Sequence, residues 1–209
     1  FVYKDYPGGD VLFDRVAVQM IAILPMSVMF LITSITMLKE RVGGTLERLW
    51  TTPMRRADLV LGYATAFTLV AVGQALVLSA VCAWALGVTI SGNWGWIILT
   101  ALLDAFVGVA IGLLISALSS TEFQAVQFMP LIVGMQIFLC GMLVPRSQLP
   151  SGLEEASLVM PMSWAVNAVG EVQAGSAVTQ GLVMDMVVLA AIGLVVLAAA
   201  PLTMPRKTR

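Results

Sequence analysis

The chain has 209 residues, of which 59% are hydrophobic and 11% are charged, and its formal net charge is −1. An average soluble domain is far less apolar and carries about twice this share of charged residues. The composition therefore excludes an ordinary soluble protein and predicts an integral membrane protein.

Residue types that usually carry catalysis or metal binding are scarce. The sequence has no histidine, which is the commonest general base and a common metal ligand. Cys82 and Cys140 each lie inside an apolar run, where small buried side chains explain them better than a disulfide or a thiolate metal site. We expect no catalytic residue and no metal site in this chain.

Five segments are apolar over about 20 residues, the length with which an α-helix crosses a bilayer. They cover residues 15–38, 59–89, 95–118, 124–144 and 180–203. We predict an all-α membrane protein in which residues 1–209 form one transmembrane domain. Its other parts would be an outer segment at 1–14, a cytoplasmic elbow at 39–58, outer re-entrant helices at 145–178 and a cytoplasmic tail at 204–209.

Basic residues gather on one predicted side of the membrane. Five of the eleven Lys and Arg lie in the first connector, and three follow the last span. Five spans place these two segments on the same side, which the positive-inside rule makes cytoplasmic. The N-terminus is then outside a plasma or inner membrane and the C-terminus is inside.

Pro25 falls within the first predicted span and Pro130 within the fourth. Proline lacks an N–H and its ring clashes with the preceding helical turn, so each is able to kink its helix. A structural kink and a gating hinge both stay open.

The segment 145–178 is divided by prolines into pieces too short to span a bilayer. We expect two short helices, with Ser151 and Ser163 as N-caps and Glu154 and Glu155 in a first turn, where the helix dipole favours acids. They would lie on or dip into the outer membrane face. The prolines that bound this predicted outer gate are Pro145, Pro150 and Pro161.

Asp104 is the one acidic residue deep inside a predicted span. A carboxylate near a helix centre costs about 2.5–3.5 kcal/mol on insertion scales, so it should face protein or water. Gly108, Gly112 and Ser116 follow at intervals of four and share its face, which is a surface that lets another helix approach closely.

No Lys or Arg lies inside a span to pair with Asp104. Its partners should therefore be polar side chains such as Gln74 or Gln136, water, or its own proton. Asp104, the two glycines and the two glutamines would line a substrate path or serve helix packing, and both interpretations stay open.

Two further acids lie near span ends. We expect Asp185, early in the last span, to be close enough to the outer interface to meet water. Glu122 should mark a helix start on the cytoplasmic side, with Ser119, Ser120 or Thr121 as its cap.

The first connector contains the turn and capping residues of a folded elbow. Gly43 and Gly44 permit a sharp change of chain direction, and Thr45 can cap a helix that follows. Thr52 and Pro53 form an N-cap and N1 pair that restarts helix into the second span.

Within the elbow, apolar residues recur with the spacing of one stripe of a short amphipathic helix. This stripe consists of Leu46, Leu49, Trp50 and Pro53. Glu47 and Arg48 lie off it and would face the cytosol, which suggests docking to a soluble protein. A loop that only holds the topology is the alternative, and it would need the positive charges alone.

The stretch ERVGGTLERLWTTP resembles the E-R-x-x-G-T-L-E-x-L-x-x-T-P signature of permease subunits of ABC-2 type exporters, which include drug, antibiotic and glycan exporters. Val42 and Gly43 depart from the polar pair often found there. The segment from Leu143 to Val169 is similar to the outer re-entrant segment of that family, with its closing Pro-x-x-x-x-x-N/D-A pattern. The matching elbow residues are Glu40, Arg41, Gly44, Thr45, Leu46, Glu47, Leu49, Thr52 and Pro53.

The resemblance implies six spans per subunit, so the sequence, which begins with Phe1, would start partway into a longer protein. It also implies a pair of permease subunits, the same or homologous, in membrane lipid, with no nucleic acid. Two ATPase subunits would dock at the elbow residues, including Arg48 and Trp50.

No G-x-x-x-x-G-K-[ST] phosphate loop occurs in the sequence, so we expect no cofactor in this chain, and ATP and Mg²⁺ on the partner. The predicted function is the permease of an ATP-driven exporter for an amphipathic drug, lipid or glycan-type substrate. The alternatives are a proton- or ion-coupled secondary transporter that uses Asp104, and an intramembrane enzyme. The first lacks a visible inverted repeat, and the second lacks a nucleophile and base pair.

Overall fold

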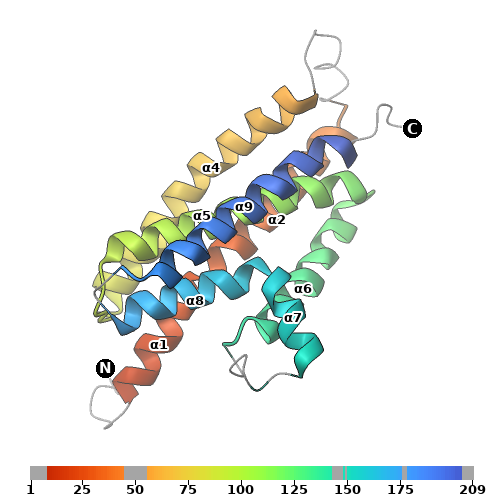
Figure 1. Ribbon diagram of the computed structural model, residues 1–209. Coiled ribbons are helices and arrows are strands. Elements are labelled where there is room, and N and C mark those ends of the chain that lie inside the picture. Colours follow the sequence, from red (N-terminus) through yellow and green to blue (C-terminus); the bar gives the residue numbers. More distant parts are fainter. Residues whose placement is uncertain (1–8, 45–55, 143–147, 149, 176–177, 204–209) are drawn as a thin grey trace.

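The structure is a computed structural model that describes residues 9–44, 56–142, 148, 150–175 and 178–203. Regular structure within these residues is entirely helical (Figure 1). The elements are α1 (Gly9–Ile21), α2 (Leu24–Val42), α4 (Arg56–Ala80), the π-helical turn η1 (Val81–Ala85), α5 (Trp94–Leu118), α6 (Glu122–Leu139), α7 (Ser151–Val159), α8 (Pro161–Ala174) and α9 (Gln180–Thr203).

Five helical segments are long and apolar enough to cross a membrane. They are Phe13–Val42, Ala57–Ala85, Trp94–Leu118, Glu122–Leu139 and Gln180–Leu202. This confirms the prediction of an all-α integral membrane protein with five visible spans. The fourth span ends earlier than its apolar composition suggests, because the chain turns at Gly141, whose φ of 87° is a conformation that glycine adopts without strain.

The first span is two helices rather than one. α1 ends at Ile21, and the amides of Ala22 and Ile23 donate to Gln19 and Met20, three residues back, at 3.0 and 3.2 Å. Pro25 accounts for the position of this break, because its ring would collide with the carbonyl of residue 21 in a continuous helix. Pro25 instead occupies the first turn of α2, where its missing N–H costs nothing.

Helix α5 is the centre of the bundle and packs against α2, α4, α8 and α9 (Figure 1). In the most apolar stretch of α5, 61% of the residues are buried inside the bundle, whereas only 22% are buried in the corresponding stretches of the spans formed by α4 and by α6. α6 and α7 stand to one side, and α7 contacts only α6 and α8 to any extent. The outward faces of α4 and α6 are therefore available to lipid or to another subunit.

The two short helices expected between the fourth and fifth spans are present as α7 and α8. Glu154 lies in the first turn of α7, as predicted, whereas Glu155, which was predicted there too, falls just after it. The two predicted serine caps are wrong: Pro150 precedes α7, and Met160 precedes α8, which begins with Pro161. Ser163 lies inside α8, fully buried, because a proline at N1 sets helical geometry without a side-chain cap.

Candidate functional site

The C-terminal turn of α2 joins three other helices, and we call Lys39, Glu40 and Arg41 with their partners the inner junction. Arg41 Nη1 donates to the carbonyl oxygen of Ala117 at 2.8 Å, and Nη2 donates to that of Ser119. These carbonyls lie at the C-terminal end of α5, where helix carbonyls lack intrahelical partners and the helix dipole is negative. Arg41 thus caps α5 from a neighbouring span.

Glu40 and Lys39 extend the inner junction to α4 and α6. Glu40 Oε2 accepts a hydrogen bond from the Tyr63 hydroxyl at 2.5 Å. Lys39 Nζ lies 3.5 Å from Glu122 Oε2, but both side chains are more than half exposed, so this ion pair is weak. Glu122 begins α6, and Thr121 is its N-cap, as predicted, since Thr121 Oγ1 accepts from the Gln124 amide at 3.2 Å.

The predicted elbow continues beyond the inner junction. The Gly43 amide donates to the Lys39 carbonyl at 2.8 Å, and Gly44 then adopts a φ of 75°, the left-handed conformation that ends many helices. The remaining predicted docking residues lie outside the described residues, so their role stays a prediction: Thr45, Leu46, Glu47, Arg48, Leu49, Trp50, Thr52 and Pro53.

At the other end of α2, Asp104 caps the broken helix. The Met26 N–H donates to Asp104 Oδ2 at 3.1 Å, and Asp104 is fully buried. Met26 is the third residue of α2, so its amide is one of those that a helix start leaves without an intrahelical partner. The carboxylate also sits at the positive end of the α2 dipole.

The glycines on the face of Asp104 bring α5 and α2 into backbone contact. A Cβ atom added to Gly108 would lie 2.4 Å from the Met26 carbonyl oxygen, and one on Gly112 would lie 2.8 Å from that of Phe30. Only glycine allows this approach, which places the Asp104 carboxylate within reach of the α2 amide.

The glutamines predicted as partners of Asp104 have other surroundings. Gln136 Oε1 accepts from the Met162 amide at 3.2 Å and so joins α6 to the start of α8. Gln74 Oε1 is buried without a hydrogen-bond partner among the described residues. The predicted partners of Asp104 were side chains, water or its own proton, and they did not include the backbone amide of Met26.

Asp185 is only 3% exposed, which contradicts its predicted contact with water. Asn167 Nδ2 donates to Asp185 Oδ2 at 2.7 Å and joins α8 to α9. The Pro-x-x-x-x-x-N/D-A pattern contains Asn167, so a signal for this residue was present in the sequence. The burial of Asp185 follows from the packing of α8 on α9, which the sequence did not show.

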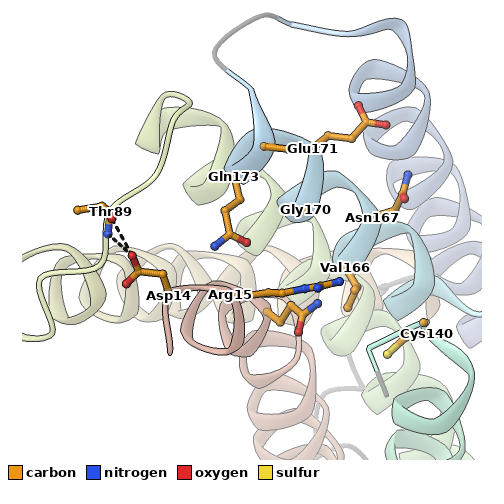
Figure 2. A pocket seen from close by; sticks show the side chains of 12 residues that line it. Asp14, Arg15, Thr89, Cys140, Val166, Asn167, Gly170, Glu171 and Gln173 are labelled. Atoms are coloured by element: carbon orange, nitrogen blue, oxygen red, sulfur yellow. Dashed lines mark hydrogen bonds between the residues drawn. The ribbon is translucent and has the colours of Figure 1, made fainter. Parts of the chain in front are cut away.

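A cavity of about 690 Å³ lies at the end of the bundle opposite the inner junction, and we call it the far-end cavity (Figure 2). It is bounded by α1, α8, the connection before α5 and the end of α6. Its lining residues are Asp14, Arg15, Gln19, Thr89, Cys140, Gly141, Val166, Asn167, Gly170, Glu171, Gln173 and Ala174. No sequence motif indicates this cavity, because its lining residues are distant in the chain.

Two of the three predicted outer-gate prolines lie at helix starts near this end. Pro150 precedes α7, and Pro161 is the first residue of α8. Pro145 lies outside the described residues. Among the residues that the structure describes, no three Cys, Asp or Glu side chains lie together as metal ligands would.

The family model described as ABC-2 type transporter matches residues 2–174 of the chain. The probable multidrug ABC transporter permease YbhR of Escherichia coli (strain K12) is 30% identical over 146 residues, which are 69% of this chain and 39% of that protein. The linearmycin resistance permease protein LnrN of Bacillus subtilis (strain 168) is 29% identical over 145 residues, covering 68% and 37%.

A eukaryotic relative, the ABC transporter G family member 20 of Dictyostelium discoideum, is 29% identical over 159 residues, which are 76% of this chain and 22% of that protein. The matched part therefore spans less than half of each of these relatives. Because the family model covers most of the chain and the helices have the length and composition of membrane spans, this chain belongs to the ABC-2 type transporter family.

Proposed function

We propose that this chain is the membrane-spanning permease subunit of an ATP-driven exporter. It would move an amphipathic drug, lipid or glycan-type substrate outward across a plasma or inner membrane. The energy would come from a separate ATPase subunit, which carries ATP and Mg²⁺ and docks at the 39–58 elbow. A second permease subunit would complete the path, with the chain start outside and its C-terminus in the cytoplasm.

The observation that carries this proposal is the inner junction. Its three consecutive residues hold the last turn of α2 to α4, α5 and α6. A displacement of the elbow would therefore act on four spans at once rather than on one. Close-packed helices respond to such a displacement by moving as units between discrete arrangements, which is the behaviour that alternating access requires.

Ion coupling through Asp104 is the competing mechanism, and the contacts of Asp104 favour a different role. Its carboxylate is enclosed between α5 and the start of α2, and it accepts a backbone hydrogen bond. This arrangement supports a positioning role for Asp104 in the bundle. Transport that depends on a proton gradient and continues without ATP would contradict this assignment.

The docking surface is tested by charge reversal in the elbow. The Glu47→Lys, Arg48→Glu double variant should recover much less ATPase subunit in copurification than the wild type, and it should lose substrate-stimulated ATP hydrolysis. A Glu155→Gln variant is the control, since it removes one exposed charge on α7, outside the elbow. Equal recovery and equal hydrolysis in the double variant would rule out docking at these residues.

A further inference from the structure

We propose that the far-end cavity is a binding site for the zwitterionic head group of an amphiphile, with Arg15 holding its anionic group and Asp14 its ammonium. The proposal concerns binding alone and does not depend on the ATPase-coupled role proposed above. It rests on the size of the cavity and on the opposite charges that Arg15 and Asp14 bring to its wall.

Arg15 is the cation of this cavity. It lies on α1 and is exposed, and among the described residues it has no hydrogen-bond or ion-pair partner. Figure 2 shows its guanidinium reaching across the cavity toward Val166 and Cys140. A guanidinium offers five N–H donors in a planar fork that fits a phosphate or a carboxylate. Arg15 thus supplies an unused anion ligand.

Two acidic side chains at the cavity wall, Glu171 and Asp14, accept hydrogen bonds from uncharged donors of the chain. Glu171 accepts from the Thr179 hydroxyl and packs against Gly181 at the start of α9, and Figure 2 shows its carboxylate turned away from Arg15. Asp14 Oδ2 accepts from the Thr89 hydroxyl at 2.7 Å and from the Thr89 amide at 3.4 Å.

Asp14 and Arg15 place opposite charges beside the cavity, and no ion pair among the described residues neutralises either one. A purely anionic ligand would meet repulsion from Asp14, and a purely cationic one would meet repulsion from Arg15. A head group that carries both charges satisfies both residues. The volume of about 690 Å³ is within the range of ligand sites and is too large for a single small ion.

The cavity wall also offers neutral hydrogen-bonding groups. Gln173 of α8 points toward α1 (Figure 2). The mostly buried Gln19 also lines the cavity. These side-chain amides would donate hydrogen bonds to hydroxyl or ester oxygens that lie next to the charged groups of the ligand. The proposed ligand is therefore a polar zwitterion whose apolar part extends beyond the cavity.

Three soluble probes of related structure test the proposal on the full-length subunit in nanodiscs of phosphatidylglycerol. Saturation-transfer NMR would compare glycerophosphocholine (zwitterion), glycerol phosphate (anion) and choline (cation). We expect glycerophosphocholine to bind most tightly. Arg15→Gln should weaken its binding about tenfold, the loss expected for a charge-assisted hydrogen bond. Arg15→Lys should recover part of the affinity.

The second charge gives an independent readout. Asp14→Asn should weaken glycerophosphocholine several-fold while leaving glycerol phosphate unchanged or slightly stronger. Lys39→Gln, which removes a cation at the opposite end of the bundle, should change neither. Thermal unfolding of each variant checks that the fold is intact.

The source of the ligand is decided by repeating the titration in nanodiscs of phosphatidylcholine. Loss of glycerophosphocholine binding there would show that bilayer lipid fills the site, and unchanged binding would show that the site receives a head group from another amphiphile. No saturable binding to the wild type, equal binding of choline or glycerol phosphate, or unchanged binding to Arg15→Gln would each overturn the proposal.

Discussion

Helices α1 and α2 come from one apolar stretch of sequence, yet they are held in the bundle in different ways. α2 is in backbone contact with α5 along Gly108 and Gly112, is capped by Asp104 at its start, and is joined to three helices at its end by the inner junction. α1 packs chiefly on α8 and borders the far-end cavity.

This difference shows that apolar composition alone does not determine how firmly a span is held in the helix bundle. Lipid tails are as apolar as leucine, so spans associate through close packing and through polar side chains that find partners. α2 has both, whereas α1 turns Asp14 and Arg15 toward a cavity. We therefore expect α2 to move together with the bundle and α1 to move independently of it.

The largest effect should come from breaking the close approach of α2 and α5. In Gly108→Ala the new Cβ would lie 2.4 Å from the Met26 carbonyl oxygen, so the two backbones must separate. We expect a loss of about 3 kcal/mol in unfolding free energy, the upper part of the range for overpacking. Thermal unfolding in detergent measures it.

Gly134→Ala in α6 is the matched control, since nothing lies within 4 Å of its added Cβ. Alanine there should be neutral or stabilising by up to about 1 kcal/mol. Equal effects at the two glycines would contradict the assigned helix contact.

Removing the cap of α2 should have the next largest effect. Asp104→Ala leaves the buried Met26 amide without its acceptor, which costs about 1–3 kcal/mol. Asp104→Asn keeps an acceptor oxygen of the same shape and should lose much less. Thermal unfolding separates the two, and transport assays add a test: lost transport in a stable Asp104→Asn variant would indicate that the carboxylate charge has a role beyond capping.

Disconnecting the inner junction should affect coupling more than stability. Arg41→Ala removes both hydrogen bonds to the end of α5, and because the site is partly exposed we expect a loss of about 1–2 kcal/mol. The stimulation of ATP hydrolysis by substrate should fall, because the elbow loses its connection to α5. Arg41→Lys keeps the charge but lacks the planar guanidinium, so its ATPase stimulation should lie between those of the wild type and of Arg41→Ala. Full stimulation in Arg41→Ala would contradict the junction as a connection.

The smallest change in stability should follow from joining α1 to α2. Pro25→Ala restores an N–H that can donate to the carbonyl of residue 21, which stabilises the folded chain. Alanine also gives the unfolded chain more conformational freedom, which offsets this gain. The free energy of unfolding should therefore change by less than about 1 kcal/mol. Hydrogen exchange of residues 22–26 should slow as the helix becomes continuous. A clear loss of transport in this stable variant would favour a hinge, and normal transport would favour a structural kink.

The sequence by itself determined the features that depend on neighbouring residues. Apolar length located the five spans, the prolines separated α7 from α8, and Thr121 before Glu122 located the start of α6. The spacing of Asp104, Gly108 and Gly112 showed that they share a helix face, since that spacing is a property of one helix. The elbow signature indicated the family that the comparison then showed.

Only the tertiary structure decided which groups meet. The partner of Asp104 is a backbone amide of another helix, Glu40 and Arg41 bind α4 and α5, and Asp185 is buried by α8. Arg15 and Gln173 line one cavity although 158 positions separate them in the sequence. Composition and spacing describe one helix at a time, whereas a cap, a junction or a cavity is formed by helices whose relative placement comes from packing.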